Sequence, residues 1–455
     1  MVFIGCAVDA QPVEGPPTVE SPPAQTPAQS ATAPALPPAG IIPANISLDG
    51  TGAPVADATF LYPLIRDALD RRIRPTLRFG ASITYGPIVP WPLIPLVIGA
   101  RTAVNVTVTI AGDDASNVVS GITTVTLNSA VVPPATPAVL FLSDDPEYLT
   151  SEGLIFHGNV NAGRPARLYY YHSDIGLPRD LDVILTATTV ASRVQLIQSE
   201  GGPDLDVMSV GHTVTRDYLQ FQHANEGTVI DLVPGTPFVV RHALILQNEL
   251  IAGAVDVTVV GGGAVTVSVV ASSGDTRPER YLGGPRVAFD GHRRHGSFDL
   301  GNYGTVVAAF TAGGPPVAAK YGGRTPTPSN LDAGDDGHDY GDYGVVRRMT
   351  FTLDNPTADP HRVYLYEKPL GGSVRSTFVV DGQFKEVDCV RLPRAYGVMT
   401  YQLPPHSTGA TTTETMTDGG SSYPLEFGVT EDQPFPYAPP VGAPDGCSPS
   451  APSAQ

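Results

Sequence analysis

The stretch Val183–Leu196, VILTATTVASRVQL, indicates the fold class, because a related pattern returns at Phe351–Leu365, FTLDNPTADPHRVYL. In each copy a strand-like run gives way to a polar turn and then to Arg-Val-x-Leu. A glycine pair follows each copy, at Gly201-Gly202 and Gly371-Gly372. Only a common framework keeps the spacings of strands and turns in step between two copies. The repetition therefore predicts two domains that share one β topology.

Turn residues separate short β-branched runs at intervals of about ten residues in both regions, which is typical of β-sandwiches. The chain holds 48 glycines and 46 prolines in 455 residues, and 42% of its residues are hydrophobic. This composition fits all-β domains with many turns. We expect an all-β fold of tandem immunoglobulin-like or β-sandwich domains, with one short helix in the N-terminal domain and disordered Pro-rich ends.

The chain divides into five predicted segments: 1–43, a truncated signal or lipobox-like start and a Pro/Ala-rich tether; 44–136, a small β-rich domain; 137–274, the first sandwich; 275–430, the second sandwich; and 431–455, a disordered tail. The helix is expected over Ala56–Ile73, packed on a sheet, with a partner-binding helix as the alternative. Thr213–Gln220 is expected to be a strand of the first sandwich. Phe351 and Val363 are expected in the core of the second sandwich.

The start of the chain resembles the bacterial lipobox at Phe3-Ile4-Gly5-Cys6. The resemblance implies that Cys6 is lipidated after cleavage, although the charged segment that normally precedes a lipobox is missing. The Pro/Ala-rich stretch Pro12–Pro43 that follows would then be an extended tether. We expect a protein of the cell envelope or the extracellular space that contacts a membrane only through Cys6. Export without an anchor and a cytoplasmic location remain the alternatives.

The net charge of −18 argues against a nucleic-acid partner, because such partners need a cationic surface. An acidic surface can instead attract cations. No run of about 18 apolar residues occurs, so no membrane-spanning helix is expected.

The segment Asp332–Asp342, DAGDDGHDYGD, is the strongest candidate metal site. The loop contains three glycines and five carboxylates, and carboxylates supply the oxygen ligands that calcium prefers. These carboxylates are Asp332, Asp335, Asp336, Asp339 and Asp342. The loop partly resembles an EF-hand loop but departs from it at Gly334 and Tyr343. The alternative is a solvated acidic loop. Calcium is the only cofactor that the sequence suggests, and the solvated loop is the favoured interpretation.

A second cluster, Tyr169–His172 with Asp174, suggests either a zinc site or a sugar-binding surface. Zinc would also require Asp204, Asp206 or His212 to come close in the fold. Tyr169 and Tyr171, with His172, are the candidate ligand-binding residues, because exposed tyrosines stack on sugars. The alternative is an ordinary strand whose aromatic side chains alternate between core and edge. A groove lined by Tyr169, Tyr171 or Tyr401 with opposed carboxylates would favour sugars.

The only basic cluster, His292–His295, could bind a carboxylate or phosphate group, but local pairing with the acidic loop downstream is the favoured interpretation. Cys389 and Cys447 could form a disulfide in an oxidising compartment, or both could stay reduced.

The sequence contains none of the common hydrolase, phosphate-loop or dinucleotide motifs. The function expected is therefore a non-catalytic, structural or adhesive role in the cell envelope. Its partner would be a cell-surface protein or a glycan, bound through loops or strand edges. The alternative is calcium-assisted binding or processing of carbohydrate.

Overall fold

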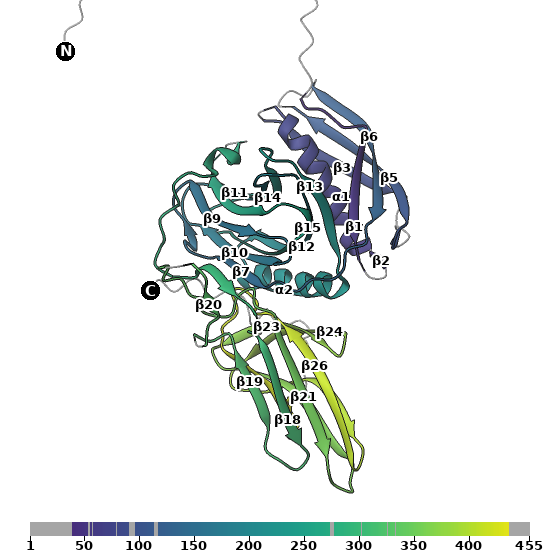
Figure 1. The fold of residues 1–455 in the computed structure, drawn as a ribbon, viewed down its shortest axis with the longest axis vertical. Helices are drawn as coiled ribbons and strands as arrows, with labels where there is room; N and C mark the ends of the chain where they lie inside the picture. Colours follow the sequence, from purple (N-terminus) through teal and green to yellow (C-terminus); the bar gives the residue numbers. More distant parts are fainter. Residues whose placement is uncertain are drawn as a thin grey trace, which may run out of the picture. The chain divides into compact units, whose positions relative to one another are not determined.

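A computed structural model describes residues 39–435, apart from 53–54, 57, 79, 91–95, 113–116, 274–276, 302, 325 and 333. Strands make up most of this part of the chain, and its two α-helices are short (Figure 1). The prediction of an all-β fold with tandem β-sandwiches is confirmed. Cys6, almost all of the predicted tether and nearly the whole predicted tail lie outside the described residues.

The N-terminal region combines one helix with six strands: β1 (Asn45–Thr51), β2 (Val55–Ala56), α1 (Ala58–Ile73), β3 (Ser82–Val89), β4 (Leu96–Val97), β5 (Arg101–Ala111) and β6 (Val118–Ser129). A 3₁₀ turn, Arg74–Thr76, follows α1. The predicted helix is confirmed, because α1 buries the expected apolar stripe, including Leu64, Leu69 and Ile73. This stripe packs against buried valines of β5 and β6 in one core.

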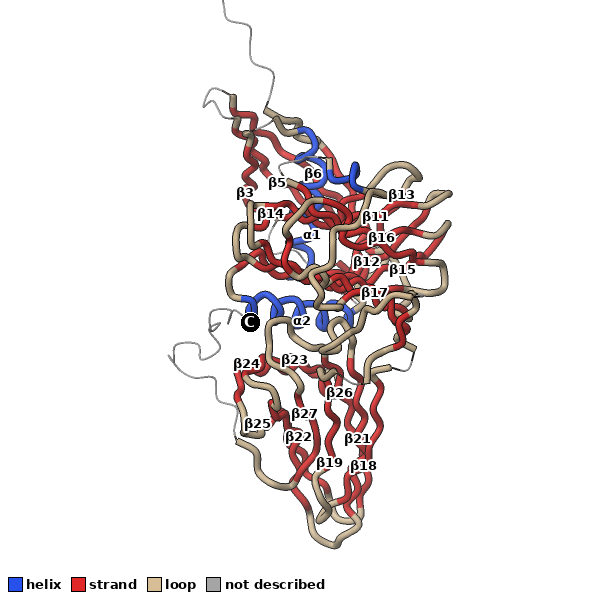
Figure 2. The backbone as a smooth tube through the Cα atoms, turned by 90° about the vertical axis from the view of Figure 1, so that its left-hand side faces the viewer, coloured by secondary structure: helices blue, strands red, loops and turns tan. Residues whose placement is uncertain are grey.

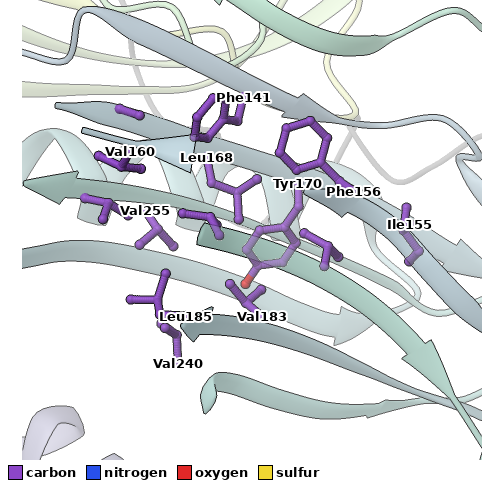
Figure 3. Packing of buried hydrophobic residues seen from close by; sticks show 14 of the residues in the cluster. Phe141, Ile155, Phe156, Val160, Leu168, Tyr170, Val183, Leu185, Val240 and Val255 are labelled. Carbon is purple, nitrogen blue, oxygen red and sulfur yellow. The ribbon is translucent and has the colours of Figure 1, made fainter. Parts of the chain in front are cut away.

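The first sandwich is built from ten strands and the second helix: β7 (Val139–Ser143), β8 (Tyr148–Leu149), β9 (Gly153–Val160), β10 (Ala166–Asp174), β11 (Arg179–Ala187), β12 (Ser192–Asp204), α2 (Val207–Ala224), β13 (Gly227–Leu232), β14 (Phe238–Ile245), β15 (Leu250–Gly262) and β16 (Val265–Ser272). The small sheet has the order β14-β11-β16-β9. Its inner side chains share a core with those of β7, β10, β12 and β15, in which Leu168, Val183 and Val255 meet (Figure 3).

The larger sheet of this sandwich continues into both neighbouring regions. Its order is β20-β17-β7-β10-β15-β12-β13-β1-β6-β5-β3, with β8 beside β10. The N-terminal region joins through β1, which pairs antiparallel with β13. Two later strands, β17 (His295–Asp299) and β20 (Ser329–Asn330), extend the other end. A short 3₁₀ helix, Pro278–Tyr281, precedes β17. Where the domain boundaries lie within this continuous sheet remains a prediction.

The second sandwich consists of nine strands: β18 (Thr305–Thr311), β19 (Val317–Tyr321), β21 (Arg347–Asn355), β22 (His361–Pro369), β23 (Ser373–Val380), β24 (Gln383–Arg391), β25 (Tyr396–Leu403), β26 (Ser407–Thr415) and β27 (Leu425–Thr430). Its sheets have the orders β18-β21-β26-β23-β24 and β19-β27-β22-β25. Phe351 and Val363 are both buried in the core between these sheets, as predicted.

The two copies of the sequence pattern occupy equivalent places in the two sandwiches. In each, the pattern spans a strand of one sheet and the next strand of the other, β11 to β12 and β21 to β22. The strands that follow also correspond. After the pattern, the next strand (β13 or β25) pairs with the second strand of the pattern. The strand after it (β14 or β26) pairs with the first strand of the pattern. The last strand (β15 or β27) pairs again with the second strand. The pairing thus agrees with the expected common topology.

The two sandwiches differ in what is inserted between these equivalent strands. The first carries the helix α2 and the second carries the hairpin β23–β24. The prediction of a strand at Thr213–Gln220 is therefore wrong, because these residues lie within α2. Asp206 caps the helix by accepting a hydrogen bond from Ser209 N at 3.0 Å. Val214 and Leu219 are among the residues that face its packing partners.

The inserted elements pack against each other and join the sandwiches. Val214 and Tyr218 of α2 share a buried cluster with Val379 of β23 and with Leu140 of β7. Figure 2 shows α2 between the strands of the two sandwiches. The unpredicted helix thus takes part in the contact between the two repeats.

Truncating Val363 to alanine is expected to lower the free energy of unfolding by about 2–4 kcal/mol, because the methyl groups leave a cavity in the second core. Val363 is 0% exposed. The matched control is Val307→Ala in β18, where the side chain is 74% exposed and the effect should be small. Urea denaturation measures both variants, and equal, near-neutral effects would show that the strand register is wrong.

Candidate functional site

A cleft lies at the open edge of the first sandwich, where β9 of the small sheet meets β7 and β17 of the large sheet. Its volume is about 280 Å³. The residues that line it are Val139, Phe141, His157, Gly158, Asn159, Asn161, Arg164, Ser297, Leu331 and Asp332. The cleft therefore combines imidazole, amide, guanidinium, hydroxyl and carboxylate groups with some apolar surface.

Strand alternation directs the side chains of β9 into this cleft. His157 and Asn159 are exposed, whereas Gly158 between them is buried. A Cβ atom at residue 158 would lie 2.8 Å from the ring of Phe141, so only glycine lets that ring pack against the strand. Although His157 is exposed, partial desolvation of its ring and the nearby Arg286 lower its pKa. The ring is therefore neutral near pH 7 and offers one donor and one acceptor.

The turn between β9 and β10 supplies a cation to the cleft. Arg164 is held by a backbone bridge to Asn161, and its side chain is half exposed. Its Nη2 atom lies 3.8 Å from Asp299 Oδ1, too far for a strong ion pair in water. The guanidinium is therefore accessible to a ligand.

The acidic loop that follows β20 borders the same cleft. Asp332 Oδ2 accepts a hydrogen bond from Ser297 N at 2.8 Å, which fixes the start of the loop against β17. Leu331, 43% exposed, adds apolar surface beside it. The loop predicted as a metal site is thus part of the cleft wall.

Beyond Asp332, the loop brings two carboxylates onto His295 of β17. His295, Asp335 and Asp336 place one ligand atom each within 4.8 Å of the others. His295 Nε2 lies 2.9 Å from Asp335 Oδ1, and Asp336 Oδ2 lies 3.3 Å from Arg293 Nε. The favoured interpretation of the basic cluster is therefore confirmed, since two of its residues pair with the acidic loop.

A third carboxylate orients His295 from the other side. Asp145 Oδ2 lies 3.1 Å from His295 Nδ1 and also accepts a hydrogen bond from Arg293 N at 2.8 Å. Burial raises the pKa of Asp145, but the hydrogen bonds from His295 and from backbone amides outweigh it and hold the pKa at about 2. Asp145 is thus ionised near neutral pH.

The five aspartates predicted to bind calcium do not converge on one point. Only Asp335 and Asp336 come together. Asp339 is buried and accepts from Tyr343 N at 2.9 Å, and burial raises its pKa. Asp342 is buried in an ion pair with Arg347 at 2.6 Å. The expected all-oxygen cage is therefore replaced by one imidazole and two carboxylates, and calcium binding remains a prediction.

The candidate sugar-binding residues of β10 do not form an exposed surface. Tyr169 and His172 are 0% exposed, and Tyr171 is half-buried. His172 lies 3.0 Å from Ser143 Oγ and 2.8 Å from the Pro146 carbonyl oxygen. These contacts correct the expectation that sugars stack on this strand, because β10 is an interior strand of the large sheet. Tyr401 does not line the cleft either.

The proposed zinc ligands of the first sandwich are also dispersed. Asp174 pairs with Arg179, Asp206 caps α2, and His212 contacts Asp418 and Glu386 of the second sandwich. Within the described residues, His295, Asp335 and Asp336 form the only group of three or more His, Cys, Asp or Glu side chains close enough to share an ion.

Cys389 lies in β24, and its pairing with Cys447 remains a prediction. The other two cysteines, Cys6 and Cys447, lie outside the described residues. A disulfide is expected in an oxidising compartment and is rare in the cytosol.

No protein-family model matches the chain, and no curated protein matches it. Among solved structures, the chain is similar to the PBSX exported protein XepA at 8% identity, with 62% of this chain and 86% of that chain covered and a TM-score of 0.16. It is similar to Lac15 from a marine microbial metagenome at 9% identity, with 70% of each chain covered and a TM-score of 0.13.

A third similar structure is the N-terminal CBM22-1-CBM22-2 tandem domain of Paenibacillus barcinonensis Xyn10C, at 6% identity, with 82% of this chain and 88% of that chain covered and a TM-score of 0.13. Similarity this low carries no argument about function. In the described part of the chain, neither helix is long and apolar enough to cross a membrane.

Proposed function

We propose that the protein is an exported, non-catalytic binding protein that holds a terminal sugar of a glycan in the cleft at the open edge of its first sandwich. The observation that carries this proposal is the lining of the cleft. Amide, carboxylate and guanidinium groups lie together there and match the neighbouring hydroxyls of a sugar as donors and acceptors. Leu331, which is 43% exposed, offers apolar surface for its C–H groups.

Two further features support this function. His157 and Asn159 lie on β9, which pairs with β16, and Ser297 lies on β17, which pairs with β7. These polar groups are therefore held in place before a ligand arrives, which lowers the cost of binding. The opposed charges of Arg164 and Asp332 favour a neutral sugar over a polyanion.

A glycan microarray with the full chain tests the proposal, followed by calorimetry with the best glycan. Replacing Arg164 by alanine is expected to weaken binding by about tenfold or more, because a charged hydrogen bond contributes about 1.5–3 kcal/mol. The matched control is Arg193→Ala, an exposed arginine of β12 that does not line this cleft and should keep full affinity. Unchanged glycan affinity in Arg164→Ala, or absence of binding to any glycan on the array, would refute the proposal.

A further inference from the structure

We infer that His295, Asp335 and Asp336 bind a divalent transition-metal ion of the zinc class. This inference does not rest on the proposed glycan binding. Ligand atoms around one zinc ion lie about 3–4 Å apart, because each metal–ligand bond is about 2.0–2.2 Å long. The three side chains offer atoms within 4.8 Å of one another, so a small side-chain adjustment closes the site.

The nitrogen of His295 points to a ligand independently of the acidic residues. His295 is 3% exposed, and its Nε2 atom is buried without a hydrogen-bond partner among the described residues. Asp335 Oδ1 lies 2.9 Å from Nε2, which is an ion pair only when the ring is protonated; in a neutral ring with its proton on Nδ1, two acceptor atoms face each other here. A buried imidazole nitrogen without a hydrogen bond is costly. An ion held between the two side chains would satisfy it.

The surroundings of His295 are those of a metal-binding histidine. Asp145 contacts Nδ1, so the proton of a neutral ring sits on Nδ1 and the lone pair of Nε2 faces the loop. Such a carboxylate behind a ligating imidazole is the usual outer-shell partner of a zinc ligand. The ring of Phe289 stacks on the imidazole at 3.9 Å and fixes its plane.

The loop itself is pinned against the strand that carries the histidine. A Cβ atom at residue 337 would lie 1.9 Å from the carbonyl oxygen of His295, so only Gly337 permits this close approach. The amide of Gly337 also donates to Asp335 Oδ1 at 2.7 Å. The carboxylate next to the imidazole is therefore positioned by the backbone.

The donor set favours zinc over calcium. Calcium takes six to eight oxygen ligands, whereas one imidazole and two carboxylates suit zinc. The two carboxylates balance the double positive charge of the ion. Arg293 competes for Asp336, but both side chains of this pair are more than half exposed, so the contact is weak and the guanidinium can swing away.

Calorimetric titration of the full chain, free of tags and washed with EDTA, tests the inference with zinc chloride and calcium chloride. We expect a 1:1 zinc complex and weaker calcium binding. His295→Gln and Asp336→Asn should reduce zinc affinity by more than the roughly 10- to 100-fold caused by loss of an outer-shell partner. The controls are His292→Gln, the other histidine of the basic cluster, and Asp231→Asn, an exposed aspartate of β13, and both should bind like the wild type.

Asp336 is exposed, so Asp336→Asn decides the test if His295→Gln does not fold. The visible spectrum of the cobalt-loaded protein gives a second readout and should change when His295 is replaced. Absence of saturable zinc binding by the wild type would overturn the inference. Unchanged zinc affinity in Asp336→Asn, or tighter binding of calcium than of zinc, would overturn it as well. Because the metal alone is titrated, this result does not depend on whether a glycan binds.

Discussion

Replacing Arg167 by methionine is expected to lower the free energy of unfolding by about 3–5 kcal/mol, because it leaves a buried carboxylate without its counter-charge. The guanidinium pairs with Asp256, with Nε 2.7 Å from Oδ1, and both side chains are less than 5% exposed. It also contacts the hydroxyl of Tyr218, which donates to Asp256 Oδ2 at 2.6 Å. Its Nη1 atom donates to the Gly344 carbonyl oxygen at 2.8 Å. The network thus ties β10, β15, α2 and the segment before β21 together.

Urea denaturation of Arg167→Met, Asp256→Leu, the double variant and a surface control separates the ion pair from simple loss of packing. In the double variant Arg167→Met/Asp256→Leu, the destabilisation should be smaller than the sum of the two single effects, because no uncompensated charge remains. Arg193→Met is the surface control. Arg193 pairs with Asp49 and Asp231 while 44% exposed, so its loss should cost less than about 1 kcal/mol. Equal effects at Arg167 and Arg193 would contradict the buried network.

Replacing His212 by glutamine is expected to remove a pH-dependent part of the stability. His212 of α2 lies with Nδ1 2.6 Å from Asp418 Oδ2 and Nε2 2.7 Å from Glu386 Oε1. Burial lowers its pKa, but the two carboxylates outweigh burial and raise the pKa to about 9. An unfolded histidine has a pKa of about 6.5. Charged His212 therefore adds about 3 kcal/mol below pH 6.5, and this stabilisation is lost as the pH rises through 9.

Thermal unfolding between pH 6 and pH 9.5 measures this contribution. The wild type should lose stability across this window, whereas His212→Gln should start lower at pH 6 and change less. At low pH the variant should lose about 3–5 kcal/mol, since Asp418 is 0% exposed and would lack its cation. His223→Gln is the matched control, because His223 is an exposed histidine of the same helix. Parallel pH profiles for the wild type and His212→Gln would contradict this interpretation of the contact.

The alternation of polar and apolar residues along short segments of the sequence was enough to predict the fold class. β5 and β6 alternate between buried and exposed residues, and their pairing places Thr102 opposite Leu127. The helix α2 was missed because Val214, Thr215 and Tyr218 favour strands by intrinsic preference. The signals that could have found it are Asp206 at the capping position and apolar residues at helical spacing behind it.

The candidate site was predicted only where its residues lie close in sequence. The basic cluster and the acidic loop are about forty residues apart, and their opposite charges predicted that these two segments pair, as Arg293 and Asp336 do. Asp145 lies 150 residues before its partner His295, so no local pattern connects the two. The cleft is likewise lined by residues of β9 and of β17, and these two strands belong to different sheets. Only the three-dimensional pairing of strands brings these groups together.

Hydrogen exchange of the full chain, resolved by peptide, tests most directly the claim that the open edge of the first sandwich is the binding face. The protein would be compared with and without the glycan that binds best on the array. If the glycan binds in the cleft, exchange becomes slower in residues 157–164 and 295–299 and in the segment that carries Asp332, with little change elsewhere. Protection confined to the second sandwich or to the N-terminal region would contradict this claim.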